Sequence, residues 1–169
     1  MWSSSALITL KNTDHIQLCE TRVNGKKIII GNIHMSNHSG KRKAQITELQ
    51  RDLNHIKDNH INVNLVVSGD FNTDAQGIKS IPIQRCSILG NTWRKSPLSK
   101  YSSQLDHVLH SQTIKLECNL RITESDHKAI VTEIKDLAKS VGIAYGSAFP
   151  PFKEKNNGID AERLEELSR

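Results

Sequence analysis

Short apolar runs alternate with polar turns over the first part of the chain, a pattern typical of β-strands. Two runs, at residues 6–8 and 16–19, are followed by Asn24-Gly25, a pair that favours a tight hairpin turn. A longer run at 26–34 follows that turn. The pattern therefore predicts consecutive paired strands that end in a longer buried strand.

Polar side chains emerge at the carboxyl end of the predicted strand 26–34. Side chains alternate across a strand, so Ile28, Ile30, Asn32 and His34 share one face. Ile28 and Ile30 are expected to anchor the core from that face. Asn32 and His34 then lie at the rim, where they are available to a ligand.

The period of the apolar positions changes from two to about 3.6 between residues 42 and 59. Ile46, Leu49, Leu53 and Ile56 recur at steps of three and four, which places them on one face of an amphipathic helix. The next apolar run, at 64–68, is again typical of a buried strand. A strand, helix and strand in this order favour a layered α/β core.

The second half of the chain is less regular and ends in a change of character. Glycines and prolines indicate loops after Asn72, and three further strands are expected at 104–110, 114–122 and 129–134. We therefore interpret residues 1–135 as a folded domain, and 136–169 as a linker with a short helical C-terminal extension.

Composition and charge indicate a single folded domain that does not span a membrane. The 169 residues are 36% hydrophobic and 24% charged, and their net charge is +5. A chain of this length forms about one domain, and its apolar runs are far shorter than the roughly 20 residues of a membrane span. A basic balance suits a polyanionic partner. Residues 1–5 lack the features of a signal peptide, so an intracellular location, cytoplasmic or nuclear and away from membranes, is expected.

Four short segments at predicted strand ends carry the candidate chemistry, because ligands bind at strand ends and the following loops in layered α/β folds. Asp70 and Asn72 project side by side if the strand geometry continues, and such a pair can orient a water molecule; a simple turn is the alternative. Asp126 can bind a hard cation beside the imidazole of His127, with a capped turn as the alternative. The segments are Asn32-Ile33-His34, Gly69-Asp70-Phe71-Asn72, Leu105-Asp106-His107 and Ser125-Asp126-His127.

Taken together and in this order, the four segments resemble the later half of the endonuclease/exonuclease/phosphatase superfamily, which has the deoxyribonuclease-I-like fold. The resemblance covers roughly residues 5–135. It implies an α/β (α+β) chain that forms half of a two-layer β-sandwich flanked by helices. It also implies hydrolysis of phosphate esters assisted by Mg²⁺ or Mn²⁺.

The resemblance also implies a role for each residue. Asp70 would act as the general base, Asn72 would position the water or the phosphate, and His127, held by Asp106, would stabilise charge on phosphorus. His34 would assist as a proton donor. Asp126 would bind the metal, and Asn32 would support the substrate.

The earlier half of the superfamily pattern, with its Asn-bearing and Glu-bearing strands, is not found in this sequence. An upstream segment or another chain is therefore expected to complete the site, and the chain alone is expected to have little activity. The inner sheet face of Ile28, Ile30 and Val66 is expected to lack its covering layer.

Three functions stay open. The first is a nuclease, with DNA preferred to RNA, in which Arg94 and Lys95 would contact phosphates. The second is a phosphatase or phosphodiesterase of inositol phosphates or lipids. The third is a non-catalytic remnant or nucleic-acid-binding module.

Overall fold

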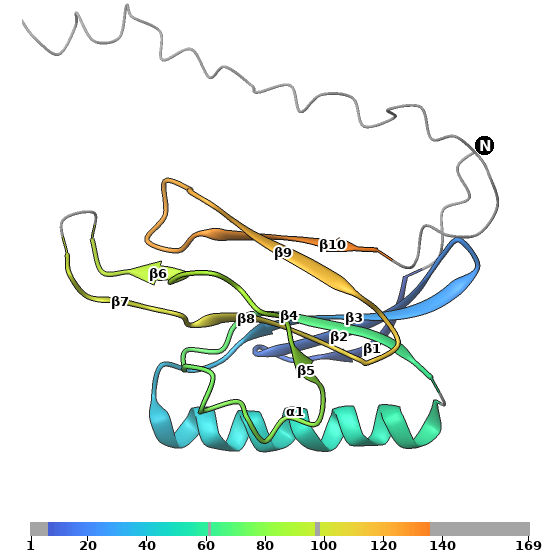
Figure 1. Ribbon diagram of the computed structural model, residues 1–169. Helices are drawn as coiled ribbons and strands as arrows, with labels where there is room; N and C mark the ends of the chain where they lie inside the picture. The colour runs from blue at the N-terminus through green and yellow to red at the C-terminus, as the bar shows by residue number, and fades with distance from the viewer. Residues whose placement is uncertain (1–6, 61, 97–98, 136–169) are drawn as a thin grey trace, which may run out of the picture.

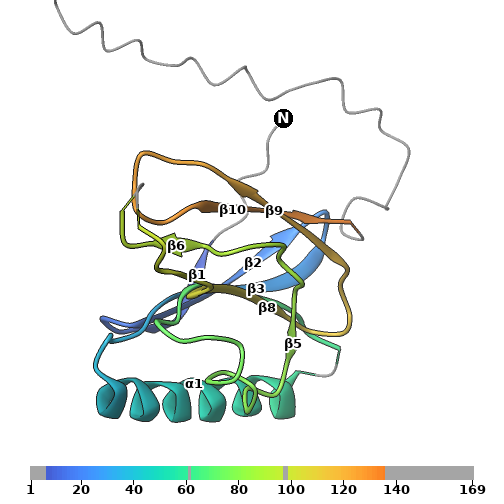
Figure 2. The same cartoon turned by 60° about the vertical axis from the view of Figure 1, so that its left-hand side comes forward.

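A mixed β-sheet lies between a helix and a β-hairpin in the computed structural model of the chain, which describes residues 7–60, 62–96 and 99–135 (Figure 1). Helix α1 (Ser39–Asn59) covers one face of the sheet, and the hairpin covers part of the other face, as the rotated view in Figure 2 also shows. The linker and helical extension expected at 136–169 lie outside the described residues. The described elements therefore form three layers.

Six strands form the main sheet, and two smaller sheets flank it. The main sheet has the order β1 (Ile8–Asn12), β2 (Ile16–Val23), β3 (Lys26–His34), β4 (Asn64–Asp70), β8 (Asp106–His110) and β5 (Gln84–Arg85). The hairpin consists of β9 (Leu116–Arg121) and β10 (Ala129–Ile134), and a short ribbon consists of β6 (Trp93–Arg94) and β7 (Ser102–Ser103).

Strand pairing follows from the connections. Strands β2 and β3 are antiparallel and joined by the predicted turn, in which Asn24 has φ 51° and Gly25 has φ 77°. Strands β3 and β4 are parallel, because α1 carries the chain back between them. Strand β8 then runs antiparallel to β4. The carboxyl ends of β3 and β4 therefore meet the start of β8 at one edge of the sheet.

The amphipathic helix predicted from residue 42 begins three residues earlier, at Ser39, and its apolar face is confirmed. Ile46, Leu49, Leu53 and Ile56 are all at most 8% exposed and belong to the core cluster between α1 and the sheet. Burial of such side chains contributes about 1.5–3 kcal/mol each. The described residues contain no helix with the length and apolar character that a membrane span requires.

The prediction that Ile28 and Ile30 both anchor the core is wrong for Ile30. Ile28 is fully buried, whereas Ile30 is 43% exposed, although both face away from α1. Ile29 and Ile33, on the opposite face, are buried against the helix. Because β3 is central and covered on both sides near Ile28, burial there does not follow a simple alternation.

A second core lies under the β9–β10 hairpin and corrects the expectation of an uncovered sheet face. Ile28 and Val66 are only 0% and 7% exposed, because the hairpin packs over them. Its inward side chains are Leu116, Cys118, Leu120, Ile130 and Ile134. Ile30 and Val23, on the same face, stay 43% and 39% exposed.

Strand boundaries differ in several places from those expected. The strand expected at 6–8 is found at Ile8–Asn12, and those expected at 104–110 and 114–122 start two residues later, at Asp106 and Leu116. The strand at 129–134 has the predicted bounds. Strands β5, β6 and β7 have only two residues each, which is too short to give a periodic signal in the sequence.

Candidate active site

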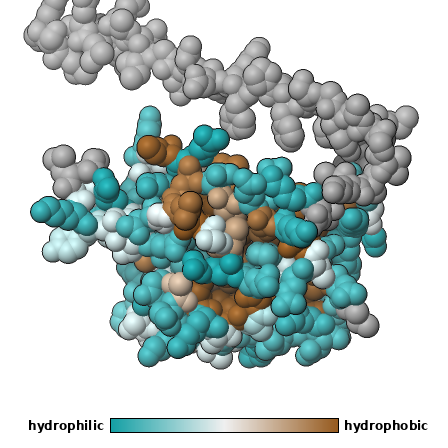
Figure 3. All heavy atoms as spheres, viewed as in Figure 1, coloured by the Kyte–Doolittle hydropathy of each residue, from teal (hydrophilic) through white to brown (hydrophobic). Residues whose placement is uncertain are grey.

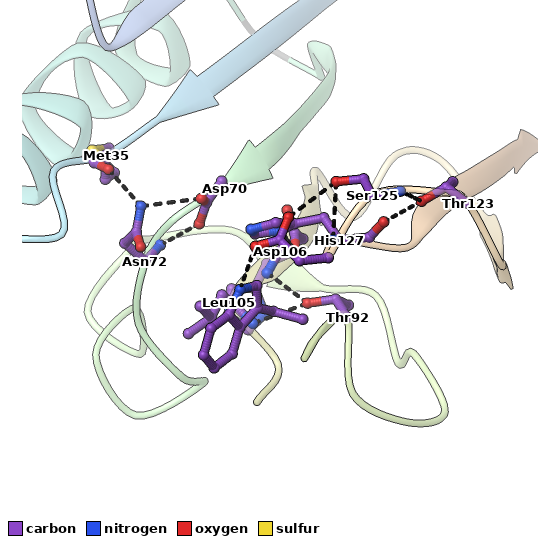
Figure 4. Close-up of polar contacts among 12 residues, drawn as sticks. Met35, Asp70, Asn72, Thr92, Leu105, Asp106, Thr123, Ser125 and His127 are labelled. Carbon is purple, nitrogen blue, oxygen red and sulfur yellow. Dashed lines mark hydrogen bonds and ion pairs between the residues drawn. The ribbon is translucent and has the colours of Figure 1, made fainter. Parts of the chain in front are cut away.

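Three candidate residues from separate segments meet at the edge where β4 ends and β8 begins (Figure 4). Asp70 closes β4, Asp106 opens β8, and these two residues pair across the strands. His127 lies in the turn before β10. One ligand atom from each of the three lies within 4.8 Å of the others.

A glycine sets the spacing of the two strands beside this group. Gly69 has φ 144° and pairs with Ile33 of β3, next to the pair His34 and Asp70. A Cβ atom at Gly69 would lie 2.0 Å from the Ile33 carbonyl oxygen. Only glycine tolerates both the φ angle and this approach. The sequence Gly-Asp therefore brings the carboxylate of Asp70 close to the end of β3.

Asn72 donates two hydrogen bonds to the carboxylate of Asp70 and a third to the backbone of Met35. Its backbone N–H donates to Asp70 Oδ1 at 2.7 Å, and its Nδ2 donates to Asp70 Oδ2 at 3.0 Å and to the Met35 carbonyl at 2.8 Å. Asn72 has φ 51°, a left-handed conformation that asparagine tolerates better than most residues. The carboxamide and the carboxylate thus lie side by side (Figure 4).

Burial raises the pKa of Asp70 above its ordinary value. The hydrogen bond from the Asn72 backbone opposes this effect, whereas the nearby charge of Asp106 adds to it. A raised pKa makes the ionised carboxylate a stronger base than an ordinary aspartate. Asp70 is therefore suited to take a proton from a water molecule.

Asp106 and His127 form a charge-assisted pair. His127 Nδ1–H donates to Asp106 Oδ2 at 2.9 Å, since an ionised carboxylate only accepts. Partial burial lowers the pKa of His127, but the hydrogen bond and charge of Asp106, with the charges of Asp70 and Asp126, outweigh it, and the net pKa is raised. The imidazole is therefore held in its protonated, donating form to higher pH.

The backbone around Asp106 is fixed by Thr92, a fully buried residue. Thr92 Oγ1 accepts hydrogen bonds from the backbone N–H groups of Leu105 and Asp106, both at 3.0 Å. The Thr92 carbonyl accepts from Lys128 N–H at 2.7 Å, beside His127. One residue therefore connects the segments that carry the two members of the pair.

The carboxylate of Asp126, the predicted metal ligand, lies outside this group. Trp93 Nε1 donates to Asp126 Oδ2 at 3.0 Å, and Ser125 Oγ donates to Oδ1 at 3.1 Å. These bonds lower the pKa of Asp126. Its role in metal binding stays a prediction, because the group of three forms without it.

The remaining predicted site residues lie outside the group of Asp70, Asp106 and His127. The exposed His34 pairs with Asp70 along the strands, and its charge lowers the pKa of Asp70 slightly. Asn32 is exposed and donates to Gln17 Oε1 at 3.3 Å, so it belongs to the sheet surface rather than to the group. Arg94 and Lys95 line a shallow depression of about 530 Å³ beside Asp126.

The donor set fits a hard divalent cation. Asp70 and Asp106 each offer carboxylate oxygens, the ligand type that Mg²⁺ prefers, and both oxygens of Asp70 keep a lone pair beyond their bonds to Asn72. Two carboxylates with a nearby imidazole form a small set for a tight site. The described residues would thus hold such an ion weakly.

Sequence reasoning assigned no supporting role in the site to three residues that have one. Thr92 orders Asp106, Trp93 engages Asp126, and the fully buried His107 contacts the loop that follows Asp70. Burial lowers the pKa of His107, so its ring is neutral. His107 stood within a recognised segment, but a histidine beside an aspartate gives no signal of which face it occupies.

Comparisons with known proteins agree on the fold. No family model matches the chain, and no curated protein matches its sequence. Truncated TDP2 of Caenorhabditis elegans matches with a TM-score of 0.61 and 18% identity over 78% of this chain and 65% of that one. The endonuclease domain of TRAS1, a telomere-specific non-LTR retrotransposon, gives 0.60 and 13% over 78% and 68%.

A third structure carries the name of the superfamily. An endonuclease/exonuclease/phosphatase family protein from Bacteroides thetaiotaomicron matches with a TM-score of 0.54 and 18% identity, over 78% of this chain and 64% of that one. The predicted deoxyribonuclease-I-like fold of this superfamily is thus confirmed. The chain spans 50% to 65% of the length of the TDP2 structures that it matches.

Proposed function

We propose that the chain carries the hydrolytic centre of a metal-dependent phosphodiesterase that acts on nucleic acid, with DNA preferred to RNA. The observation that carries the proposal is the meeting of Asp70, Asp106 and His127 within 4.8 Å at one edge of the sheet. These side chains come from three segments distant in sequence. A base and a proton donor in reach of one phosphate are the requirement for in-line hydrolysis.

Asp70 is the base in this proposal. Its carboxylate can accept a proton from a water molecule, and it is held in place by Asn72. The carboxamide oxygen of Asn72 can accept from the same water, since its Nδ2 is already occupied by Asp70 and Met35. The pair thus orients the nucleophile as well as activating it.

His127 stabilises the charge that develops on phosphorus. Its Nδ1–H donates to Asp106, and in the protonated ring that the raised pKa of His127 favours, Nε2–H is also available to donate to a non-bridging oxygen. Fixed donors aimed at developing charge are the strongest catalytic contribution of many hydrolases. His34, at the end of β3 beside Asp70, lies on the side from which a leaving group could be protonated.

A divalent cation completes the chemistry. Mg²⁺ or Mn²⁺ bound by Asp70 and Asp106 would neutralise charge on the phosphoryl oxygens. Asp126 is the third carboxylate in this proposal, and it would have to turn towards the group from its present bonds to Trp93 and Ser125.

Two observations support nucleic acid as the substrate. The chain has a net charge of +5, and Arg94, Lys95 and Lys128 line the depression beside Asp126. Cationic side chains along the path of a phosphate backbone supply most of its nonspecific affinity. The likeness to the TRAS1 endonuclease domain agrees with this choice.

A further polypeptide segment, upstream or on another chain, completes the enzyme in this proposal. Among the described residues β10 pairs with β9 alone, which leaves its outer edge open to another strand. Ile30 on β3 and Val131 on β10 are 43% and 50% exposed, and apolar side chains reach the surface around the hairpin in Figure 3. A further segment packed here would bury part of this apolar surface.

The test compares nicking of supercoiled plasmid by the chain, by Asp70→Asn, by His127→Ala and by the matched control Glu133→Gln, whose carboxylate is exposed on β10. We expect slow Mg²⁺-dependent nicking that both site variants lose and the control keeps. Equal residual nicking in Asp70→Asn and the unaltered chain would refute the proposal. Fast turnover by the chain alone would refute the need for a further segment.

Products separate the other candidate functions. Release of inorganic phosphate from inositol phosphates, without nicking, would favour the phosphatase alternative. Salt-sensitive binding of DNA that neither Mg²⁺ nor Asp70→Asn changes would favour a non-catalytic binding module.

A further inference from the structure

His107 lies directly behind the candidate site and is fully buried, yet none of the proposed steps uses it. It follows Asp106 in β8, so strand alternation places it on the opposite face, towards α1. Its Nε2 lies 2.8 Å from the carbonyl oxygen of Thr73. Its ring meets the Phe71 ring nearly edge-on, with centroids 5.7 Å apart and planes at 68°.

The hydrogen bond fixes the tautomer of this imidazole. A carbonyl oxygen only accepts, so Nε2 carries the proton and Nδ1 is unprotonated. Nδ1 is buried and has no partner among the described residues. A buried unpaired nitrogen costs free energy that an apolar ring of similar size would not. The hydrogen bond to Thr73 is therefore the contact that an apolar residue could not replace.

Phe71, which meets the ring of His107, and Thr73, which accepts its hydrogen bond, flank Asn72. Asn72 has φ 51°, and its backbone N–H and carboxamide both donate to Asp70. Left-handed backbone is uncommon outside glycine and needs support from its surroundings. His107 supplies this support on both sides, through the ring of one neighbour and the carbonyl of the other.

We propose that His107 is a positioning residue, which holds the backbone of Asn72 so that its two donors stay on the carboxylate of Asp70. The use of that aligned pair in hydrolysis rests on the proposed function, but the alignment itself does not. Among the described residues the His107 side chain has no hydrogen bond to Asp70 or His127, and it acts through Phe71 and Thr73 on either side of Asn72.

The test measures backbone amide hydrogen exchange at Asn72 by NMR in two variants of the whole chain. His107→Phe keeps an aromatic ring against Phe71 but has no donor, whereas His107→Gln keeps an N–H at similar reach. We expect His107→Phe to accelerate exchange at Asn72 by up to about tenfold, which corresponds to the loss of one hydrogen bond. The exchange rate at Asn72 is compared with the rates of the slowest amides of β3 and β4. We expect His107→Gln to restore protection.

Each outcome decides the proposal. Unchanged relative exchange in His107→Phe, or loss of protection in a folded His107→Gln, would overturn it. If a variant fails to fold, the unaltered chain still provides a test, because the ¹⁵N shifts of the His107 ring report its tautomer. A proton on Nδ1 instead of Nε2 would overturn the proposal.

These measurements need no substrate, so failure of the hydrolase assay leaves them interpretable. Conversely, Asp70→Asn could abolish hydrolysis while His107→Phe leaves the amide exchange at Asn72 unchanged. These two results together would support the proposed function and reject the positioning role of His107. In an active, completed enzyme, His107→Phe should lower kcat with little change in KM, since the side chain contacts no substrate.

Discussion

Replacing Gly69 with alanine should disrupt the chain far more than its small size suggests. The new Cβ would lie 2.0 Å from the Ile33 carbonyl oxygen and 2.8 Å from the Ile33 carbonyl carbon and nitrogen. An ordinary carbon–oxygen contact is about 3.3 Å, so β3 and β4 would have to separate by about 1.3 Å. The obstacle is backbone, which no rotamer change can move aside.

Two contributions set the magnitude. A non-glycine residue at φ 144° costs of order 1–3 kcal/mol, and overpacking adds about 1–3 kcal/mol. We therefore expect Gly69→Ala to lower the free energy of unfolding by about 4 kcal/mol. Gly25 offers a matched control, because it has φ 77° and nothing within 4 Å of its would-be Cβ. Gly25→Ala should cost only about 1–2 kcal/mol.

Urea unfolding followed by circular dichroism measures both variants. A third variant, Gly31→Ala, would contact only the side chains of Leu18 and Val67, which can shift, so an intermediate loss is expected. Equal losses in Gly69→Ala and Gly25→Ala would refute the reasoning. The φ angle alone would then explain the glycine, and the close approach of the strands beside Asp70 would not matter.

Other predictions concern the histidine pair and the core. Asp106→Asn should lower the pKa of His127, measured by NMR titration of its ring; an unchanged pKa would contradict the pairing. Because folding raises the pKa of His127, its pairing with Asp106 stabilises the fold fully at pH values below the unfolded-state pKa of about 6.5. This stabilisation is lost as the pH rises through the folded-state pKa of His127. Leu53→Ala, in the fully buried helix face, should cost about 2–5 kcal/mol in urea unfolding, whereas Leu89→Ala, at a 90% exposed site, should stay within about 0.5 kcal/mol.

The helix and the long strands could be predicted because their burial follows one period. Leu49 and Leu53 face a single sheet, so their spacing alone indicates the helix and its buried side. Ile28 and Ile29 are both buried because β3 has a layer on each side, and a run of apolar residues then gives no information on which face is covered. The exposure of Ile30 depends on how far the distant β9–β10 hairpin reaches.

The candidate site was predictable as a set of segments but not as a geometry. Asp70 and Asp106 follow from their positions at strand ends, where the sheet brings them together. The direction of Asp126 depends on Trp93, which belongs to a strand of two residues without a pattern of its own. Thr92 gave no signal either, because a buried hydroxyl that orders backbone amides resembles any other threonine in sequence.

The order of the segments along the chain has a consequence for synthesis. Asp70, Asp106 and His127 stand at increasing sequence positions, and the hairpin that carries the imidazole is the last described element to be made. Domains form from the N-terminus during translation. A nascent chain released as far as β8 would already present both carboxylates but would lack the imidazole, so the group of three side chains would form only when the final hairpin closes over the sheet.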